Sequence, residues 1–133
     1  MRQFAREQTA ALIHKLAEAV HQAAREADEE SIHDVRVAMR RLSRCLRVFA
    51  PFYPDGYWKK IRHRLSSLMA AAGAVRDCDI AMELLRQNGV SRRAAVMAQL
   101  AAARKKHGDE LLREVRRWKR EGFQHKWKSR LEL

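Results

Sequence analysis

The sequence contains few cysteines, prolines and glycines, and each shortage excludes a class of protein. The only two cysteines among its 133 residues are Cys45 and Cys78, too few for the disulfide framework of a small secreted protein. We therefore expect buried free thiols and a cytoplasmic protein. Two prolines, five glycines and the absence of strand-like alternation between apolar and polar residues predict an all-α fold.

Long apolar runs and known catalytic motifs are also absent. No segment approaches the roughly 18 consecutive apolar residues of a membrane span, and the N-terminus lacks the apolar core of a signal peptide. The sequence has no glycine-rich phosphate loop, no nucleophile elbow and no metal-ligand spacing. We therefore predict a protein with no membrane span, no catalytic residue, no metal and no cofactor.

Acidic residues are scarce relative to basic ones. The chain has 28 lysines and arginines against 16 aspartates and glutamates, which gives a formal net charge of +12. Such a balance favours a polyanionic partner, namely nucleic acid, an inorganic polyanion or an anionic membrane surface. The length suits one domain with a modest core.

Apolar residues at helical spacing predict an antiparallel four-helix bundle with one short extra helix, over residues 1–120. The long helices are expected at about 3–27, 31–49, 57–72 and 92–120, and the short helix at about 75–87 after a break at Gly73. Ser31 and Ser91 are predicted N-caps, and Val96 is expected on the inward side of the last long helix. Residues 121–133 are interpreted as a frayed basic tail, or as an element that docks on a partner.

The second predicted helix carries the strongest functional signal. No acidic residue lies between Asp34 and Asp55. The apolar residues of this helix point one way, and the opposite side forms what we call the arginine face: His33, Arg36, Arg40, Arg44 and Arg47. Ordinary solvated faces mix charges of both signs, whereas guanidinium groups bind phosphate with two hydrogen bonds. The arginine face therefore predicts polyanion binding.

Neighbouring residues extend this hypothesis. His33 is expected at the second position of its helix, where free backbone N–H groups favour an anion. The next helix carries Lys59, Arg62 and His63 on one side, so that two antiparallel helices would line a shared basic groove. Asp77 and Asp79 are predicted to charge the first turn of the short helix favourably. The aromatic residues between 52 and 58 are interpreted as a packed end of the bundle, which disfavours base stacking.

Two segments resemble the CHAD domain family, the conserved histidine α-helical domains. Residues 32–49, Ile-His-Asp-Val-Arg-Val-Ala-Met-Arg-Arg-Leu-Ser-Arg-Cys-Leu-Arg-Val-Phe, resemble the signature helix of that family. Residues 68–80 resemble its leucine–glycine–arginine–aspartate segment at the expected distance, with Ala72 where leucine commonly precedes the glycine. The resemblance covers about residues 32–85.

The resemblance implies a helical bundle that binds inorganic polyphosphate without turnover and associates with polyphosphate granules. The basic residues that match the family motifs are His33, Arg36, Arg40, Arg41, Arg44 and Arg76, to which helix geometry adds Arg47, Lys59, Arg62 and His63. The triphosphate tunnel enzyme domain that often accompanies this family has no counterpart motif here, so its activity is not expected.

The number of repeats differs from the usual family pattern. CHAD domains usually hold two repeats around a basic pore, whereas this chain holds one signature helix. Either a homodimer with a twofold axis rebuilds the pore, or the sequence is one part of a longer protein. Three alternatives to polyphosphate binding stay open: nonspecific nucleic-acid binding, an accessory role in phosphoanhydride hydrolysis, and docking on acidic proteins.

Overall fold

The computed structural model describes residues 1–133 and consists of α-helices joined by short connections. The helices are α1 (Arg2–Arg25), α2 (Glu29–Val48), α3 (Tyr57–Gln87), α4 (Ala95–Glu121) and α5 (Phe123–Arg130), with a 3₁₀ turn, η1, at Ala50–Phe52. The predicted all-α bundle of four long helices and one short helix is confirmed, although the short helix lies at the C-terminus rather than at residues 75–87.

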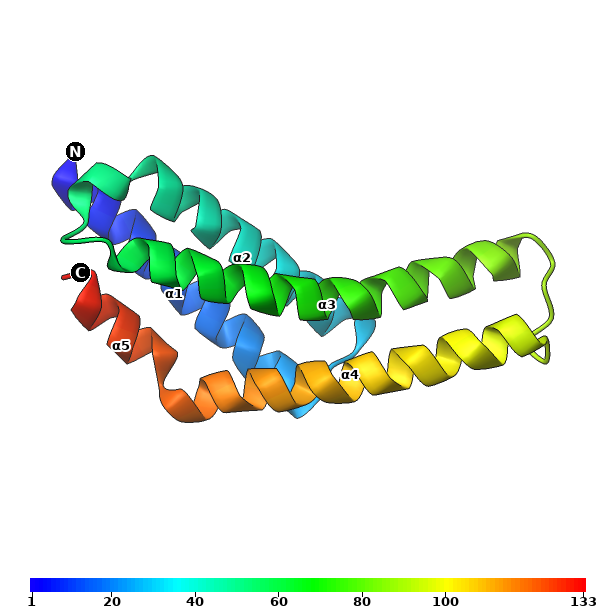
Figure 1. Cartoon of the computed structure of the whole chain (residues 1–133). Coiled ribbons are helices and arrows are strands. Elements are labelled where there is room, and N and C mark those ends of the chain that lie inside the picture. The colour runs from blue at the N-terminus through cyan, green and yellow to red at the C-terminus, as the bar shows by residue number, and fades with distance from the viewer.

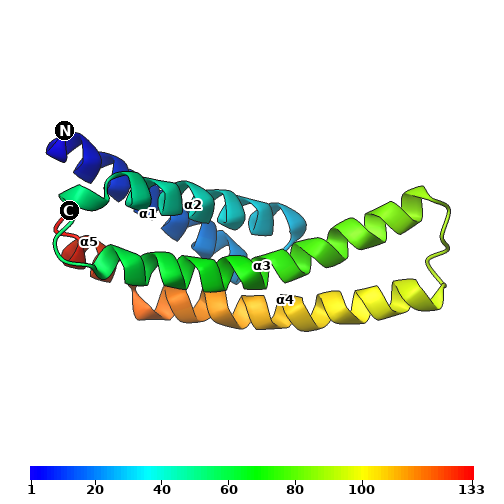
Figure 2. The same cartoon turned by 45° about the horizontal axis from the view of Figure 1, so that its top comes forward.

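Two helical hairpins form the body of the bundle. α1 and α2 lie side by side and cover one half of the hairpin that α3 and α4 make (Figures 1 and 2). α5 folds back along the body, so that both termini lie at the same end (Figure 1). The largest fully buried side chains are Trp118, Trp127, Ile13, Leu16, Ile32, Met39, Leu42, Leu46, Ile61, Leu65, Leu68 and Leu111.

The start of α2 differs from the prediction. Asp28, not Ser31, is the N-cap, and its Oδ1 accepts a hydrogen bond from the Ser31 N–H at 2.8 Å. This hydrogen bond lowers the pKa of the Asp28 carboxyl. The Ser31 hydroxyl lies inside the first turn and donates to the Glu26 carbonyl oxygen at 2.7 Å. The helix therefore begins at Glu29, about two residues earlier than predicted.

The predicted break at Gly73 does not occur. α3 continues through this glycine for 31 residues. A glycine inside a helix costs only about 1 kcal/mol relative to alanine, and the neighbouring Ala72 and Val75 are fully buried in the core. Asp77 and Asp79 therefore lie in the middle of a helix, where they cannot charge a first turn.

The C-terminal residues 121–133 are part of the core and do not form a frayed tail. Gly122 has a φ of +64°, a left-handed conformation that glycine adopts without strain, and it turns the chain from α4 into α5. Phe123, Trp127 and Leu131 are then buried at helical spacing. The Trp127 ring meets that of Trp118 edge-on, with the centroids 5.4 Å apart.

The start of α4 also lies later than predicted. Its N-cap is Ala94, which makes no side-chain capping bond, and Ser91 instead accepts a hydrogen bond from the Arg93 N–H in the connection before the helix. The helix end predicted at about residue 87 is confirmed, with Asn88 as the C-cap of α3 and Gly89 at a φ of +79°.

Part of the α3–α4 hairpin extends beyond the body. The Arg104 Nε donates to the Asp79 Oδ1 at 3.2 Å and ties the two helices together, and a second guanidinium nitrogen of Arg104 donates to the carbonyl oxygen of Ala27, between α1 and α2. Past this pair, residues 80–103 project as a two-helix arm (Figure 1) that holds no buried side chain. Val96, expected on the inward side, lies in this arm and is 42% exposed.

The predicted aromatic corner after α2 is a packed end of the bundle. Tyr53 is buried, and its hydroxyl lies 2.7 Å from the Thr9 Oγ1. Because the Thr9 hydroxyl donates to the Ala5 carbonyl oxygen at 2.7 Å, the Tyr53 hydroxyl is the donor to Thr9. Burial raises the pKa of Tyr53 well above its ordinary value.

The Tyr53→Phe variant tests this buried hydrogen bond. Near pH 8 we expect it to lower the free energy of unfolding by about 1 kcal/mol. Above about pH 10 the tyrosine ionises in the unfolded state but keeps its proton in the folded state. The free energy of unfolding of the wild type therefore falls by about 1.4 kcal/mol per pH unit, and that of the variant does not fall for this reason. Urea unfolding at pH 8 and pH 11 measures both effects. A stability difference that does not shrink between these pH values would contradict the burial of this hydroxyl.

Candidate polyanion-binding site

The packing of α2 determines where its arginines point. Val35, Met39, Leu42 and Leu46 are buried against the other helices. Because these residues recur at steps of four and three, the opposite side of the helix remains in solvent. The arginine face predicted from the sequence is therefore held by the core on a rigid helix.

A groove between α2 and α3 gathers part of this face. It has a volume of about 430 Å³, and Arg40, Arg44 and Arg47 from α2 meet Arg62 from α3 along it. Its remaining lining residues are Met39, Ser43, Leu65, Ser66, Met69 and Ala70. The groove thus combines four guanidinium groups and two hydroxyls with apolar side chains, and no aromatic or acidic residue contributes to it.

The arginines of the groove have no acidic partner. No carboxylate oxygen lies within 4.0 Å of Arg40, Arg44, Arg47 or Arg62. Arg62 makes one hydrogen bond, from its Nε to the Ser43 Oγ at 3.2 Å, which links the two walls. Four adjacent like charges repel one another, so this arrangement favours a bound anion.

Some arginines elsewhere in the body pair with carboxylates. Arg64, only two residues after Arg62, pairs with Glu121 at 2.8 Å and lowers the pKa of that carboxyl. Arg117 pairs with the same carboxylate at 3.2 Å. The groove differs from these ion pairs because four arginines from two helices meet in it and no acidic residue lines it.

Other predicted site residues lie outside this groove. His33 and Arg41 line a separate groove between α1 and α2, together with Lys15 and the acidic Glu18 and Asp34. His33 is also the fifth residue of α2, because the helix begins at Glu29. It is therefore not beside the free N–H groups of the helix N-terminus, which corrects the predicted second position.

The remaining predicted residues are distributed around the α2–α3 pair. Lys59 and His63 are exposed on α3 and do not line the groove. Arg76 pairs with Glu29 at 2.7 Å. Arg36 is half-buried, and its buried Nε has no hydrogen-bond partner. The structure thus brings together four of the ten predicted residues in one groove.

Ser43 is the wall residue that the sequence interpretation missed. It lies seven residues after Arg36, and therefore on the same side of α2 as that arginine. Its hydroxyl both accepts from Arg62 and lines the groove. The available signal was its position between two arginines of the face, but serine in a helix is usually solvated and gives no charge signal.

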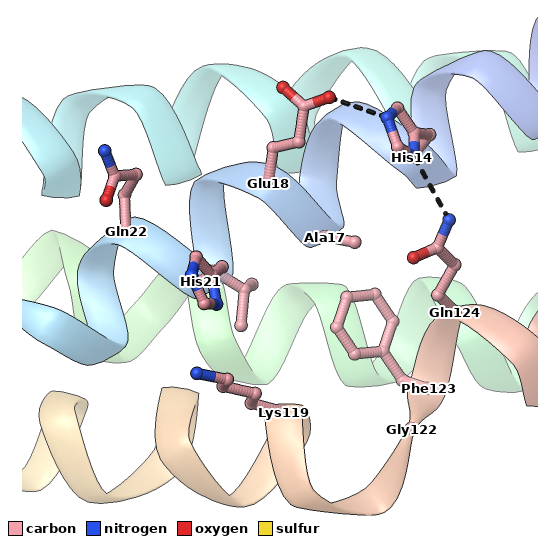
Figure 3. A pocket seen from close by; sticks show the side chains of 10 residues that line it. His14, Ala17, Glu18, His21, Gln22, Lys119, Gly122, Phe123 and Gln124 are labelled. Carbon is pink, nitrogen blue, oxygen red and sulfur yellow. Dashed lines mark hydrogen bonds and ion pairs between the residues drawn. The ribbon is translucent and has the colours of Figure 1, made fainter.

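A second pocket, between α1 and the α4–α5 turn, contains histidines (Figure 3). His14 Nε2 lies 2.7 Å from the Glu18 Oε1, and His14 Nδ1 lies 3.3 Å from the Gln124 side-chain nitrogen. Lys119 and His21 lie on the other side of the pocket from that pair (Figure 3). This pocket contains the carboxylate of Glu18, whereas no acidic residue lines the α2–α3 groove.

Two further features bear on the kind of site present. No group of three or more histidine, cysteine, aspartate or glutamate side chains is placed to hold a metal ion. No helix combines the length and the apolar character that crossing a membrane requires.

Comparison with known proteins gives one match. Residues 5–133 match the family model of the CHAD domain, which covers nearly the whole chain and includes α5. A search of curated proteins and a search of solved structures gave no match.

Proposed function

This chain belongs to the CHAD domain family, and on that premise we propose that it binds inorganic polyphosphate in the α2–α3 groove without chemical turnover. The observation that carries the proposal is the set of four arginines, from two helices, that share one groove without an acidic partner. The family is linked to polyphosphate, and a linear polyanion of closely spaced phosphates suits a line of guanidinium groups. Association with polyphosphate granules would follow from such binding.

The groove favours phosphates over nucleobases. Proteins that bind single-stranded nucleic acid combine a basic groove with aromatic side chains on which bases stack. No aromatic residue lines the α2–α3 groove, and the aromatic rings of Trp118, Phe123 and Trp127 are buried against one another. Phosphate contacts alone carry no preference for a base.

The arginines of the groove are charged at all physiological pH values, and their spacing suits a chain of phosphates. On α2 the residues Arg40, Arg44 and Arg47 are one turn apart, about 5.4 Å along the axis. A flexible polyanion lying along α2 would meet one guanidinium per turn, while Arg62 contacts it from the opposite wall. The hydrogen bond from Arg62 to Ser43 restricts that side chain before binding, which lowers the entropy lost on binding.

A salt series of polyphosphate affinities tests this proposal. Neutralising about four phosphates releases counterions, so we expect log K to fall against log salt with a slope of about −3. The affinity should then drop about 50-fold between 50 and 200 mM salt. Fluorescence anisotropy with end-labelled polyphosphate gives the slope. A slope near zero, or affinity too weak to measure at 50 mM salt, would contradict electrostatic binding.

A pH series separates the groove from His33. Because arginine keeps its charge at physiological pH, binding through the groove alone predicts an affinity that changes less than about twofold from pH 6 to 8. If protonated His33 binds as the family motif implies, the affinity falls as pH rises. That fall would then disappear in His33→Ala. The same anisotropy assay distinguishes the two outcomes, and a flat profile assigns binding to the arginines.

A further inference from the structure

The two-helix arm, residues 80–103, exposes apolar side chains that the body does not cover. Six large hydrophobic residues are exposed in the whole chain, and three of them, Ile80, Leu84 and Val96, lie in the arm. Their exposures are 41%, 54% and 42%. Exposed apolar residues that gather in one place are typical of a contact surface between proteins.

Two of these residues, Ile80 and Leu84, line a groove on one side of the arm. It has a volume of about 750 Å³ and runs between α3 and α4. Its apolar lining residues are Ile80, Met82, Leu84, Met97, Ala98 and Ala101. Methionine side chains adapt readily to an apolar partner, and small alanines on α4 let another helix approach closely.

The charges around this groove differ from those of the α2–α3 groove. Three acidic and three basic residues line it, namely Glu29, Asp79, Glu83, Arg76, Arg86 and Arg92. Such a rim is close to neutral and does not attract a polyanion. In a chain of net charge +12, it is a face that a second copy can approach without strong repulsion, since Glu29, Glu83 and Asp79 each pair with an arginine of the same chain.

The exposed area of the chain is also larger than its mass requires. The protein exposes 8415 Å², whereas a compact monomer of 15.5 kDa exposes about 7,200 Å². The excess of about 1,200 Å² exceeds the roughly 800 Å² per partner that a standard interface buries. In both views the arm extends beyond the body, and this extension is the departure from a compact shape (Figures 1 and 2).

We propose that the arm is the interface of a homodimer, in which the α3–α4 arms of two copies pack into a four-helix bundle about a twofold axis. Each two-helix arm lacks a core of its own, and pairing supplies one. This proposal rests on the apolar face, the neutral rim and the exposed area, and it does not depend on polyphosphate binding.

Light scattering on the full chain tests the dimer. At 50 µM in 0.15 M salt we expect a mass twice the 15.5 kDa of the chain. Leu84→Asp should return the mass to that of the monomer, because it places a charge in the arm groove. Val48→Asp is the matched control, since Val48 is 68% exposed on α2, outside the arm, and it should leave the dimer intact. A monomeric wild type, or a Leu84→Asp variant that stays dimeric, would overturn the proposal.

Hydrogen exchange of the wild type provides a test that needs no substitution. We expect the amides of residues 80–101 to exchange at least tenfold faster after dilution from 100 µM to 1 µM, while those of the body keep their rates. Exchange in the arm that is independent of concentration would argue against pairing. If Arg40→Ala/Arg44→Ala loses polyphosphate binding but keeps the mass of the dimer, the polyphosphate site and the dimer interface are independent of each other.

Discussion

The Arg40→Ala/Arg44→Ala variant is expected to bind polyphosphate about 100-fold more weakly than the wild type. Both side chains line the α2–α3 groove, and neither has an acidic partner to satisfy it in the free protein. A hydrogen bond to a charged group contributes about 1.5–3 kcal/mol, so the loss of two such contacts costs about 3 kcal/mol or more, and 100-fold is the lower end of the expected loss. Equilibrium anisotropy at fixed salt measures the change.

A second double variant that removes the same number of charges separates the effect of their position from the effect of net charge. Arg113→Ala/Arg120→Ala also removes two exposed, unpaired arginines, but from α4, away from the groove. We expect a loss of less than about fivefold, caused by the reduced overall field alone. If both double variants lose affinity equally, binding follows net charge and the groove is not the site.

The Trp127→Ala variant is expected to lower the free energy of unfolding by about 3–5 kcal/mol, as large aromatic-to-alanine changes in cores do. Trp127 is fully buried, and its ring packs against those of Trp118 and Phe123. A domain of this size is stable by only about 5–15 kcal/mol, so the variant should approach the limit of folding. Urea unfolding followed by circular dichroism measures the loss.

Lys126→Ala is the matched control on α5. Lys126 is exposed and precedes Trp127 directly, so its removal should change the stability by less than about 0.5 kcal/mol. If Trp127→Ala were equally mild, residues 121–133 would behave as the frayed tail that their basic composition suggests. The structure predicts that Trp127→Ala lowers the free energy of unfolding much more than Lys126→Ala does.

Periodicity predicted the core of α2 and the arginines opposite it. The buried residues Val35, Met39 and Leu42 recur at helical spacing, and this recurrence fixes the directions of the charged residues between them. Local pattern is sufficient here because one helix determines both faces. The expectation that α2 and α3 place basic residues along a shared groove also holds for Arg40, Arg44 and Arg62.

Helix boundaries were predicted less well, because caps compete locally. Ser31 and Asp28 both suit an N-cap, and the choice of Asp28 depends on the Ser31 hydroxyl reaching the Glu26 carbonyl across the turn. Gly73 predicts a break by propensity, but burial of its neighbours keeps α3 continuous. Tertiary packing decides the case of Gly73, whereas hydrogen bonds within the turn decide the start of α2.

The sequence alone does not indicate which groove each basic residue lines. His33 and Arg40 lie on one side of α2, yet the neighbouring helices assign His33 to the α1–α2 groove and Arg40 to the α2–α3 groove. That assignment depends on how α1 and α3 flank α2. The buried Trp127 was similarly hidden by the lysines around it, since its burial requires the turn at Gly122.

A competition between long-chain polyphosphate and nucleic acid at 0.15 M salt tests whether the α2–α3 groove is a polyphosphate site. The protein would be preloaded with labelled single- or double-stranded DNA and titrated with either polyanion, with the Arg40→Ala/Arg44→Ala variant in parallel. We predict that polyphosphate displaces DNA at a lower phosphate concentration than unlabelled DNA does, and that the variant loses most of this preference. Equal displacement by both polyanions, unchanged in the variant, would contradict a polyphosphate site in the α2–α3 groove.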